Sequence, residues 1–168
     1  RWLLPPEEKD FQQAGGREQV YLHVKRWLKD EEKKALEAQG CRFGGPFTGH
    51  TYRAMLEAGA WARIKDNPLI AGVAPVLDED KLHQPLFRLV KANDPATGPA
   101  AAANRAVKVA VKWMPGAVNA PKAFLAGKAQ NPVLGQSNGS SIVRLTPPEI
   151  ARLAALPEVA YLHFIEYV

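Results

Sequence analysis

The sequence predicts an α+β protein built from two copies of one small domain. The first observation is a weak internal repeat, in which an Ala-Arg-apolar triplet, a proline and apolar residues occur within 62–73 and again within 151–162, 89 positions later. The second is an alternation of apolar and polar residues over 20–24 and 107–113, which is typical of half-buried strands. Helical runs that stop at glycine or proline lie between such strands. Because a repeat at a fixed interval indicates repeated units, two tandem domains explain the 168 residues better than one larger domain.

The first copy is expected to follow the order β-α-β-β-α-β. Asp30 is a suitable N-cap for its first helix, and Gly40 is a suitable C-terminal stop. Gly44-Gly45-Pro46 weakens the next strand and predicts a bulge or an edge strand, and the second helix is expected to end before Pro68. The predicted elements are a strand over 20–27, a helix over 30–39, strands over 41–47 and 51–56, a helix over 60–66 and a strand over 69–76.

One residue breaks the alternation of the first strand. Val20, Leu22 and Val24 share one face, whereas Trp27 falls on the opposite parity. The sequence leaves open whether a bulge intervenes and Trp27 packs at the strand's end, or whether its ring faces outward. An outward Trp27 would be a candidate contact for a partner protein or for the other domain, because aromatic residues are enriched at interfaces.

The second copy repeats the order. Thr146 and Glu149 form the capping box of its best-marked helix, which begins at Pro147 and ends before Pro157. The turn around Asn138-Gly139 is typical of a hairpin. The predicted elements are a strand over 107–113, a short helix over 121–126, a weak strand over 131–134, a strand over 141–145, the capped helix and a strand over 159–165.

A β-α-β-β-α-β order predicts the ferredoxin-like arrangement, one antiparallel sheet with two helices on a single face. We therefore expect an N-terminal arm over 1–16, a first domain over 17–90, a Pro- and Ala-rich linker over 91–105 and a second domain over 106–168. The linker is assigned from its prolines, its glycine and its run of alanines, which supply little apolar bulk.

Composition and motifs argue against an enzyme. The net charge of +5 comes from scattered Lys and Arg, which favours a solvated surface over a nucleic-acid groove. Cys41 is the single cysteine, which excludes an intrachain disulfide, and the four histidines show no metal-ligand spacing. Ser140 and Ser141 lack the context of a nucleophile. No run approaches the roughly 18 to 20 apolar residues that span a bilayer. We expect no catalytic residues, no metal, no cofactor and no membrane span.

Two stretches carry a resemblance to a known family. The run Leu-Thr-Pro-Pro-Glu-Ile-Ala-Arg-Leu-Ala-Ala-Leu-Pro-Glu-Val-Ala-Tyr at 145–161 resembles the last helix and strand of subtilisin propeptide-like inhibitor domains. The first copy resembles the propeptide-like domains found ahead of some bacterial subtilases. Its likeness lies in the Val-Tyr-Leu-His-Val-Lys strand at 20–25, the helix ending Ala-Gln-Gly at 38–40, and Ala-Pro at 74–75 followed by Asp-Lys-Leu at 80–82. A protease domain is absent from the printed sequence.

The resemblance implies a non-catalytic protein-binding module that acts as a protease inhibitor or an intramolecular chaperone. In such domains the helix-free face of the sheet packs against a subtilisin-like protease, and a C-terminal tail enters the active-site cleft as an added strand. The tail corresponds here to 165–168. The candidate protein-binding residues are Trp2, Leu3 and Leu4 of the arm, Trp27, Tyr161 and His163 of the last strand, and Ile165, Glu166, Tyr167 and Val168 of the tail.

A second interpretation is a structural subunit of an extracellular homo-oligomeric or filamentous assembly, in which the partners are copies of the chain. The predicted last strand leaves only 166–168 as a tail, and the apolar residues at 2–4 could pair with a neighbouring copy. Nucleic-acid binding through the sheet ranks last, because the aromatic pattern of RNA-binding domains is missing. The chain opens at Arg1, as expected of a mature product or a fragment, and we expect a secreted or extracellular protein.

Overall fold

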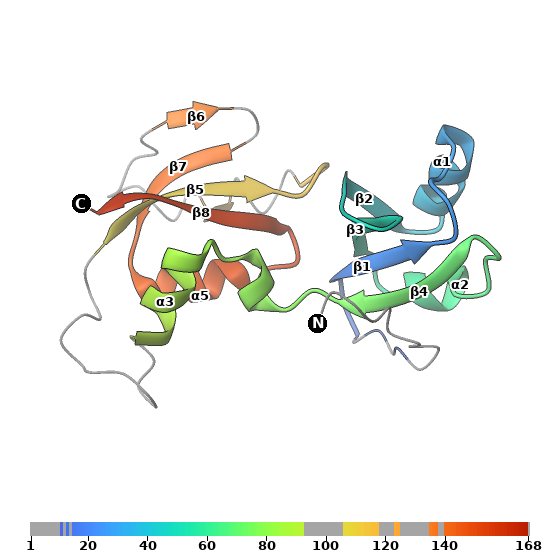
Figure 1. Cartoon of the computed structure of the whole chain (residues 1–168), viewed down its shortest axis with the longest axis horizontal. Coiled ribbons are helices and arrows are strands. Elements are labelled where there is room, and N and C mark those ends of the chain that lie inside the picture. The colour runs from blue at the N-terminus through green and yellow to red at the C-terminus, as the bar shows by residue number, and fades with distance from the viewer. Residues whose placement is uncertain are drawn as a thin grey trace. The chain divides into compact units, whose positions relative to one another are not determined.

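The computed structural model describes residues 11, 13, 15–92, 106–117, 123–124, 135–137 and 140–167. The chain divides into two compact units, Arg1–Val76 and Leu77–Val168. Each unit contains an antiparallel sheet with helices packed on it (Figure 1). The predicted α+β class with antiparallel sheets is therefore confirmed.

The first unit holds its strands in the spatial order β2-β3-β1-β4. β1 lies in the interior of the sheet and pairs antiparallel with both β3 and β4, so β1 and β2, which follow one another in the sequence, are not neighbours in the sheet. Its elements are β1 (Glu18–Val24), α1 (Asp30–Ala38), β2 (Cys41–Pro46), β3 (Thr51–Leu56), α2 (Ala60–Ile64) and β4 (Ile70–Pro75).

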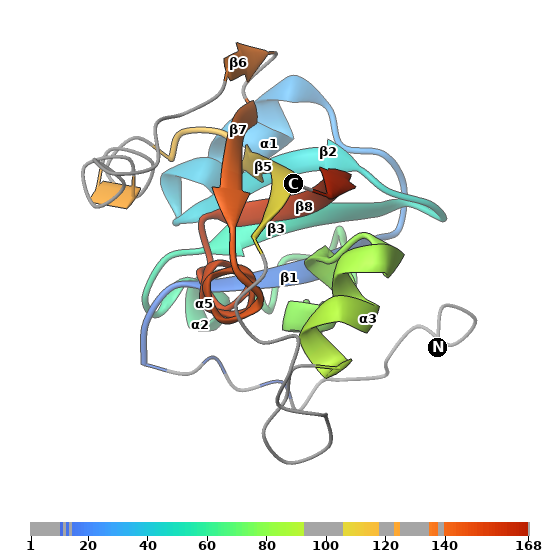
Figure 2. The same ribbon diagram turned by 90° about the vertical axis from the view of Figure 1, so that its left-hand side faces the viewer.

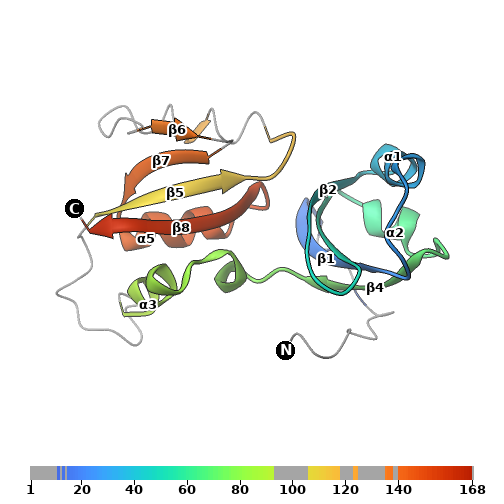
Figure 3. The same cartoon turned by 45° about the horizontal axis from the view of Figure 1, so that its top comes forward.

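One apolar core joins this sheet to its helices. Val20, Leu22 and Val24 project from β1 into the core, and Leu36 and Ile64 reach it from α1 and α2. Both helices lie on the same side of the sheet (Figure 3). The alternation in β1 thus assigns one face to the core, because successive side chains of a strand point to opposite faces.

Local signals set the ends of these elements. The N–H of Lys29 donates to the Glu32 carboxylate at 2.7 Å, so the N-cap is Lys29 and not Asp30 as predicted. The physical reason is that the side chain of Glu32 reaches back to the residue before the first turn. Gly40 ends α1 at φ +96°, where a Cβ would lie 2.9 Å from Arg63 Nη2, so the predicted glycine stop is confirmed. The predicted bulge is also present, because the register of β2 shifts between Phe43 and Pro46.

The second unit holds its strands in the order β6-β7-β5-β8, again antiparallel. Residues 123 and 124 of the predicted helix over 121–126 are helical, whereas the predicted strand over 131–134 and the turn at 138–139 lie outside the described residues. The elements are the short 3-10 helix η1 (Asp78–Lys81), α3 (Gln84–Ala92), β5 (Val107–Trp113), β6 (Gly135–Ser137), β7 (Ser140–Leu145), α5 (Pro147–Ala154) and β8 (Val159–Tyr167).

The core of the second unit lies between its sheet and the helices α3 and α5. Val109 and Val111 of β5 meet Leu86 of α3 and Ile150 of α5, and all four are fully buried. Figure 2 views α5 along its axis, with α3 beside it. The N–H of Thr146 donates to the Glu149 carboxylate at 2.8 Å, which confirms the predicted capping box. The two segments of the sequence repeat therefore fold as α2 with β4 and as α5 with β8.

The boundary between the units lies earlier than the sequence analysis placed it. Residues 77–92, which we assigned to the end of the first domain and the start of the linker, belong to the second unit. Leu86 is fully buried in its core, and Leu89 and Val90 pack against that core. The helix α3 was not predicted. Its apolar stripe must be buried against some sheet, and only long-range packing decides which.

Candidate protein-binding site

The second sheet has a face that α3 and α5 do not cover. The side chains of β5 alternate, so Val107, Val109 and Val111 enter the core while the intervening residues project from the opposite face. The same alternation holds in β7 and, apart from its bulges, in β8. We call this surface the open face; its described residues in β5, β7 and β8 are Lys108, Ala110, Lys112, Ser140, Ile142, Arg144, Tyr161, His163 and Glu166.

Strand pairing arranges the open face in three cross-strand rows. The residues run from β7 through β5 to β8 in each row, because β5 pairs with both neighbours. The first row contains Arg144, Lys108 and Glu166; the middle row contains Ile142, Ala110 and His163; the third contains Ser140, Lys112 and Tyr161. The half-buried Ile142 and Ala110 thus form an apolar centre between two rows that carry cations.

The charges of these rows are unequal. The Lys108 ammonium donates to the Glu166 carboxylate at 2.8 Å. This hydrogen bond, followed by the attraction between the two charges, lowers the pKa of Glu166 below its ordinary value. Lys112 and Arg144 are both exposed. With one carboxylate against three cations among its described residues, the open face is cationic at neutral pH.

The corresponding face of the first sheet is different. Gln19, Tyr21 and Met55 lie on its helix-free side, yet they are only 3%, 5% and 2% exposed. The ring of Phe47 lies 5.5 Å from that of Tyr21, and the Arg53 guanidinium lies 5.7 Å from the Tyr21 ring centre. The face is therefore closed over Tyr21 by side chains of its own unit.

Trp27 lies outside the first strand, because β1 ends at Val24. Its ring meets those of His50 and Tyr52 edge to face, at 5.1 and 5.2 Å, and remains 43% exposed. The predicted strand over 20–27 was too long, since the register of β1 against β4 shifts at His23–Val24 and the chain then turns toward α1. Each alternative therefore holds in part, because a bulge is present at His23–Val24 and the Trp27 ring is exposed while it contacts His50 and Tyr52.

The proposed tail is part of the last strand. Glu166 pairs with Lys108 and Tyr167 with Val107, so β8 continues to Tyr167 and not to 165 as predicted. A bulge between Lys108 and Val109 accommodates Ile165, which is 37% exposed. Glu166 and Tyr167 form no separate extended tail, because both pair with β5. Val168, the remaining tail residue, lies outside the described residues.

The other edge of β8 carries a short added segment. Leu82 forms a parallel bridge with Leu162, and the N–H of His83 donates to the Leu162 carbonyl at 2.9 Å. The His83 ring stacks on that of His163, with centroids 4.3 Å apart and planes 9° from parallel. His163 is therefore positioned both by β8 and by the segment that precedes α3.

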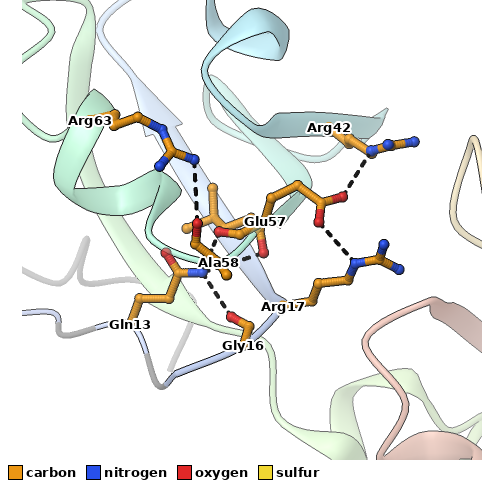
Figure 4. Close-up of polar contacts among 8 residues, drawn as sticks. Gln13, Gly16, Arg17, Arg42, Glu57, Ala58 and Arg63 are labelled. Carbon is orange, nitrogen blue, oxygen red and sulfur yellow. Dashed lines mark hydrogen bonds and ion pairs between the residues drawn. The ribbon is translucent and has the colours of Figure 1, made fainter.

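A polar corner of the first unit fixes the residues ahead of β1. The Gln13 side chain donates to the carbonyl of Glu57 at 2.6 Å (Figure 4). Its amide oxygen accepts the Trp61 N–H at 3.0 Å. The carboxylate of Glu57 lies 2.9 Å from Arg17 Nε and 3.1 Å from Arg42 Nε. Phe11 packs edge to face on Trp61, at 5.6 Å. The described part of the predicted arm thus docks on its own unit, whereas Trp2, Leu3 and Leu4 lie outside the described residues.

Sequence reasoning placed Tyr161, His163 and Glu166 at the candidate site but missed its cations. The signal was the strand 107–113 itself, whose polar positions are Lys108, Ala110 and Lys112. Arg144 joins them only through the pairing of β7 with β5. Within the described ranges, no group of three His, Cys, Asp or Glu residues could hold a metal ion, and no helix has the length and apolar character needed to cross a membrane.

No protein-family model matches the chain, and no curated protein matches it.

Proposed function

We propose that the chain is a non-catalytic protein-binding module of two ferredoxin-like, propeptide-related domains, acting as an inhibitor or folding chaperone of a subtilisin-like protease. The strand orders β2-β3-β1-β4 and β6-β7-β5-β8 support the ferredoxin-like assignment, since both place the first strand between the third and the fourth. The resemblance of 145–161 to propeptide-like inhibitor domains supports the family assignment. A secreted or extracellular setting follows as part of the same proposal.

The observation that carries the proposal is the open face of the second unit. One side of the sheet is sealed by α3 and α5, whereas the other presents Ile142, Ala110 and Tyr161, all half-buried, among charged groups. An apolar centre with a polar rim is the usual composition of a protein interface. A sheet face of this kind suits a flat or convex protein surface better than a small molecule, which needs a concave pocket.

Binding through the open face also fits the position of 165–167. Because these residues belong to β8, affinity would come from the face, and insertion of a tail into a protease cleft would require the end of β8 to separate from β5. We therefore assign the open face the main binding role and the end of β8 a secondary one.

The test is light scattering coupled to size-exclusion chromatography, on the chain alone and mixed with a subtilisin-like protease inactivated at its catalytic serine. A stoichiometric complex is expected. Ala110→Glu, at the centre of the open face, should abolish it, whereas Ala155→Glu, exposed at the end of α5, should leave it intact. Absence of any complex across a panel of such proteases would overturn the proposal.

A second candidate, self-assembly into an extracellular oligomer, is favoured by one observation. Ile165 is exposed at a bulge of β8. It lies three residues after Leu162, the residue at which Leu82 bridges the outer edge of β8. Exposed apolar strand edges pair with other chains. The same chromatography decides: a mass that increases with concentration in the absence of protease supports assembly, and Ile165→Lys should then restore the monomer.

A further inference from the structure

The open face carries three cationic side chains around an apolar centre. Lys108 and Arg144 occupy one outer row and Lys112 the other, with the apolar pair Ile142 and Ala110 between them. Glu166 is the one carboxylate among the described residues of the face, and it is paired with Lys108. From this arrangement we infer that the open face binds an acidic protein surface, one that places carboxylates on both sides of an apolar ridge. The inference deepens the proposed function and rests on it for the class of partner.

The spacing of the rows determines how far apart the carboxylates of the partner must lie. Lys108 and Lys112 are four residues apart on one strand, which corresponds to roughly 13 Å at the strand rise per residue. Carboxylates separated by that distance occur about four residues apart on a strand, or about eight to nine residues apart on a helix. An apolar residue between them would meet Ala110, whose small side chain leaves room at the centre.

The scarcity of aromatic side chains on the open face favours a protein over a nucleic acid as the partner. Single-stranded nucleic acids need aromatic platforms on which bases stack, and β-sheet RNA binders supply two or three of them. Among the described residues of the open face, Tyr161 is the one Phe, Tyr or Trp, and it is half-buried at the end of its row. The centre of the face is aliphatic instead, which suits an apolar side chain of a protein.

The first experiment needs no knowledge of the partner. Poly-L-glutamate is titrated into the isotopically labelled chain, and backbone amide shifts are followed by NMR. Shifts confined to β5, β7 and β8 are expected, and they should vanish in K112E/R144E. The charge-matched control K34E/K65E changes two exposed lysines of the first unit and should retain them. Shifts spread over both units, or tighter binding of a single-stranded oligonucleotide of equal charge, would overturn the inference.

The second experiment uses the subtilisin-like protease inactivated at its catalytic serine. K112E/R144E is expected to weaken the complex by roughly tenfold or more at low salt, with the difference shrinking as salt screens the charges. A K112Q/R144Q pair, which removes the charges without reversing them, should give an intermediate loss. Equal unfolding midpoints of the variants and the parent chain exclude misfolding as the cause.

The two experiments separate the inference from the proposed function. A protease complex that K112E/R144E leaves unchanged would overturn the inference and keep the function. Failure to bind any protease, with poly-L-glutamate still confined to β5, β7 and β8, would overturn the protease partner and keep the acidic-surface inference. Loss of both would overturn both.

Discussion

The ammonium group of Lys81 donates a hydrogen bond of 2.9 Å to the carbonyl oxygen of Ala154, which lies 73 residues further along the chain. A second bond of 2.8 Å reaches the carbonyl of Leu156. Both carbonyls lie at the C-terminal end of α5, where backbone oxygens have no partner within the helix and the helix dipole is negative. Lys81 is only 2% exposed, so a long-range lysine caps α5 from inside the second unit.

Removing this cap should destabilise the second unit. Lys81→Met keeps most of the apolar stem but leaves two carbonyls of the α5 terminus without their donor. The expected loss is about 2 kcal/mol, the usual size for hydrogen bonds to a charged group. Urea unfolding followed by circular dichroism measures it. Lys91→Met, at an exposed lysine of α3, should change stability by much less, and an equal loss in both variants would contradict the capping role.

The assignment of α3 to the second unit predicts a unit-specific effect of Leu86→Ala. Leu86 is fully buried among residues of β5, β7 and α5, so truncation should cost about 3 kcal/mol. Amide hydrogen exchange should accelerate in β5 and β7, while β1 and β3 keep their protection. Leu77→Ala, at an exposed leucine, is the matched control. If exchange accelerated only in β1 and β3, α3 would belong to the first unit and the assignment would be wrong.

Gln13, which precedes β1 and belongs to no helix or strand, is expected to stabilise the first unit. Gln13→Ala removes an acceptor from the Trp61 N–H and a donor from the Glu57 carbonyl. Since each lost hydrogen bond costs about 1 kcal/mol, the unfolding free energy should fall by roughly 1 to 2 kcal/mol. Differential scanning calorimetry measures the stability of Gln13→Ala and of the control Gln39→Ala, which changes an exposed glutamine at the end of α1. No difference between the two would show that residues ahead of β1 do not support the unit.

Glu32 gives the first unit a pH-dependent contribution to stability. Hydrogen bonds from the Arg26 side chain and then from the Lys29 N–H lower the pKa of Glu32 to about 2. The folded state thus favours the charged form, and the contribution is present above the ordinary carboxyl pKa and lost as the pH falls through about 2.

Glu32→Gln should therefore be less stable than the parent chain at pH 7, with the difference closing between about pH 4.5 and pH 2. Thermal unfolding across this range measures it, and Glu31→Gln on the same turn serves as control. If the difference in stability between Glu32→Gln and the parent chain did not change with pH, the lowered pKa of Glu32 would not be its cause.

Cys41 is expected to be inert while the first unit is folded. Its side chain is fully buried, and this burial, with a smaller effect of Glu37, raises the pKa of the thiol to about 12. Since the thiolate is the reactive form, alkylation by iodoacetamide at pH 8 should be very slow in buffer and rapid in denaturant. Mass spectrometry follows the reaction, and rapid stoichiometric labelling of the folded chain would contradict the burial.

Local sequence signals predicted much of the fold. The strand of 107–113 follows its alternation, α1 stops at Gly40, and α5 begins behind the Thr146–Glu149 pair. Each of these outcomes depends on residues within a few positions of one another, which is why the chain alone suffices to predict them. The open face could be predicted in part, because the parity of β5 assigns Lys108 and Lys112 to one side.

What the sequence determined by itself is the alternation of β1 and β5, the C-terminal stop of α1, the start of α5, and the polar face that β5 presents. Tertiary structure decided that 77–92 belongs to the second unit, that Lys81 caps α5, that Trp27 turns outward and that β8 continues through Glu166 and Tyr167. The physical reason is common to all four. An amphipathic helix or a strand end has a pattern that many partners satisfy, and only the packing of distant residues selects the partner that is present.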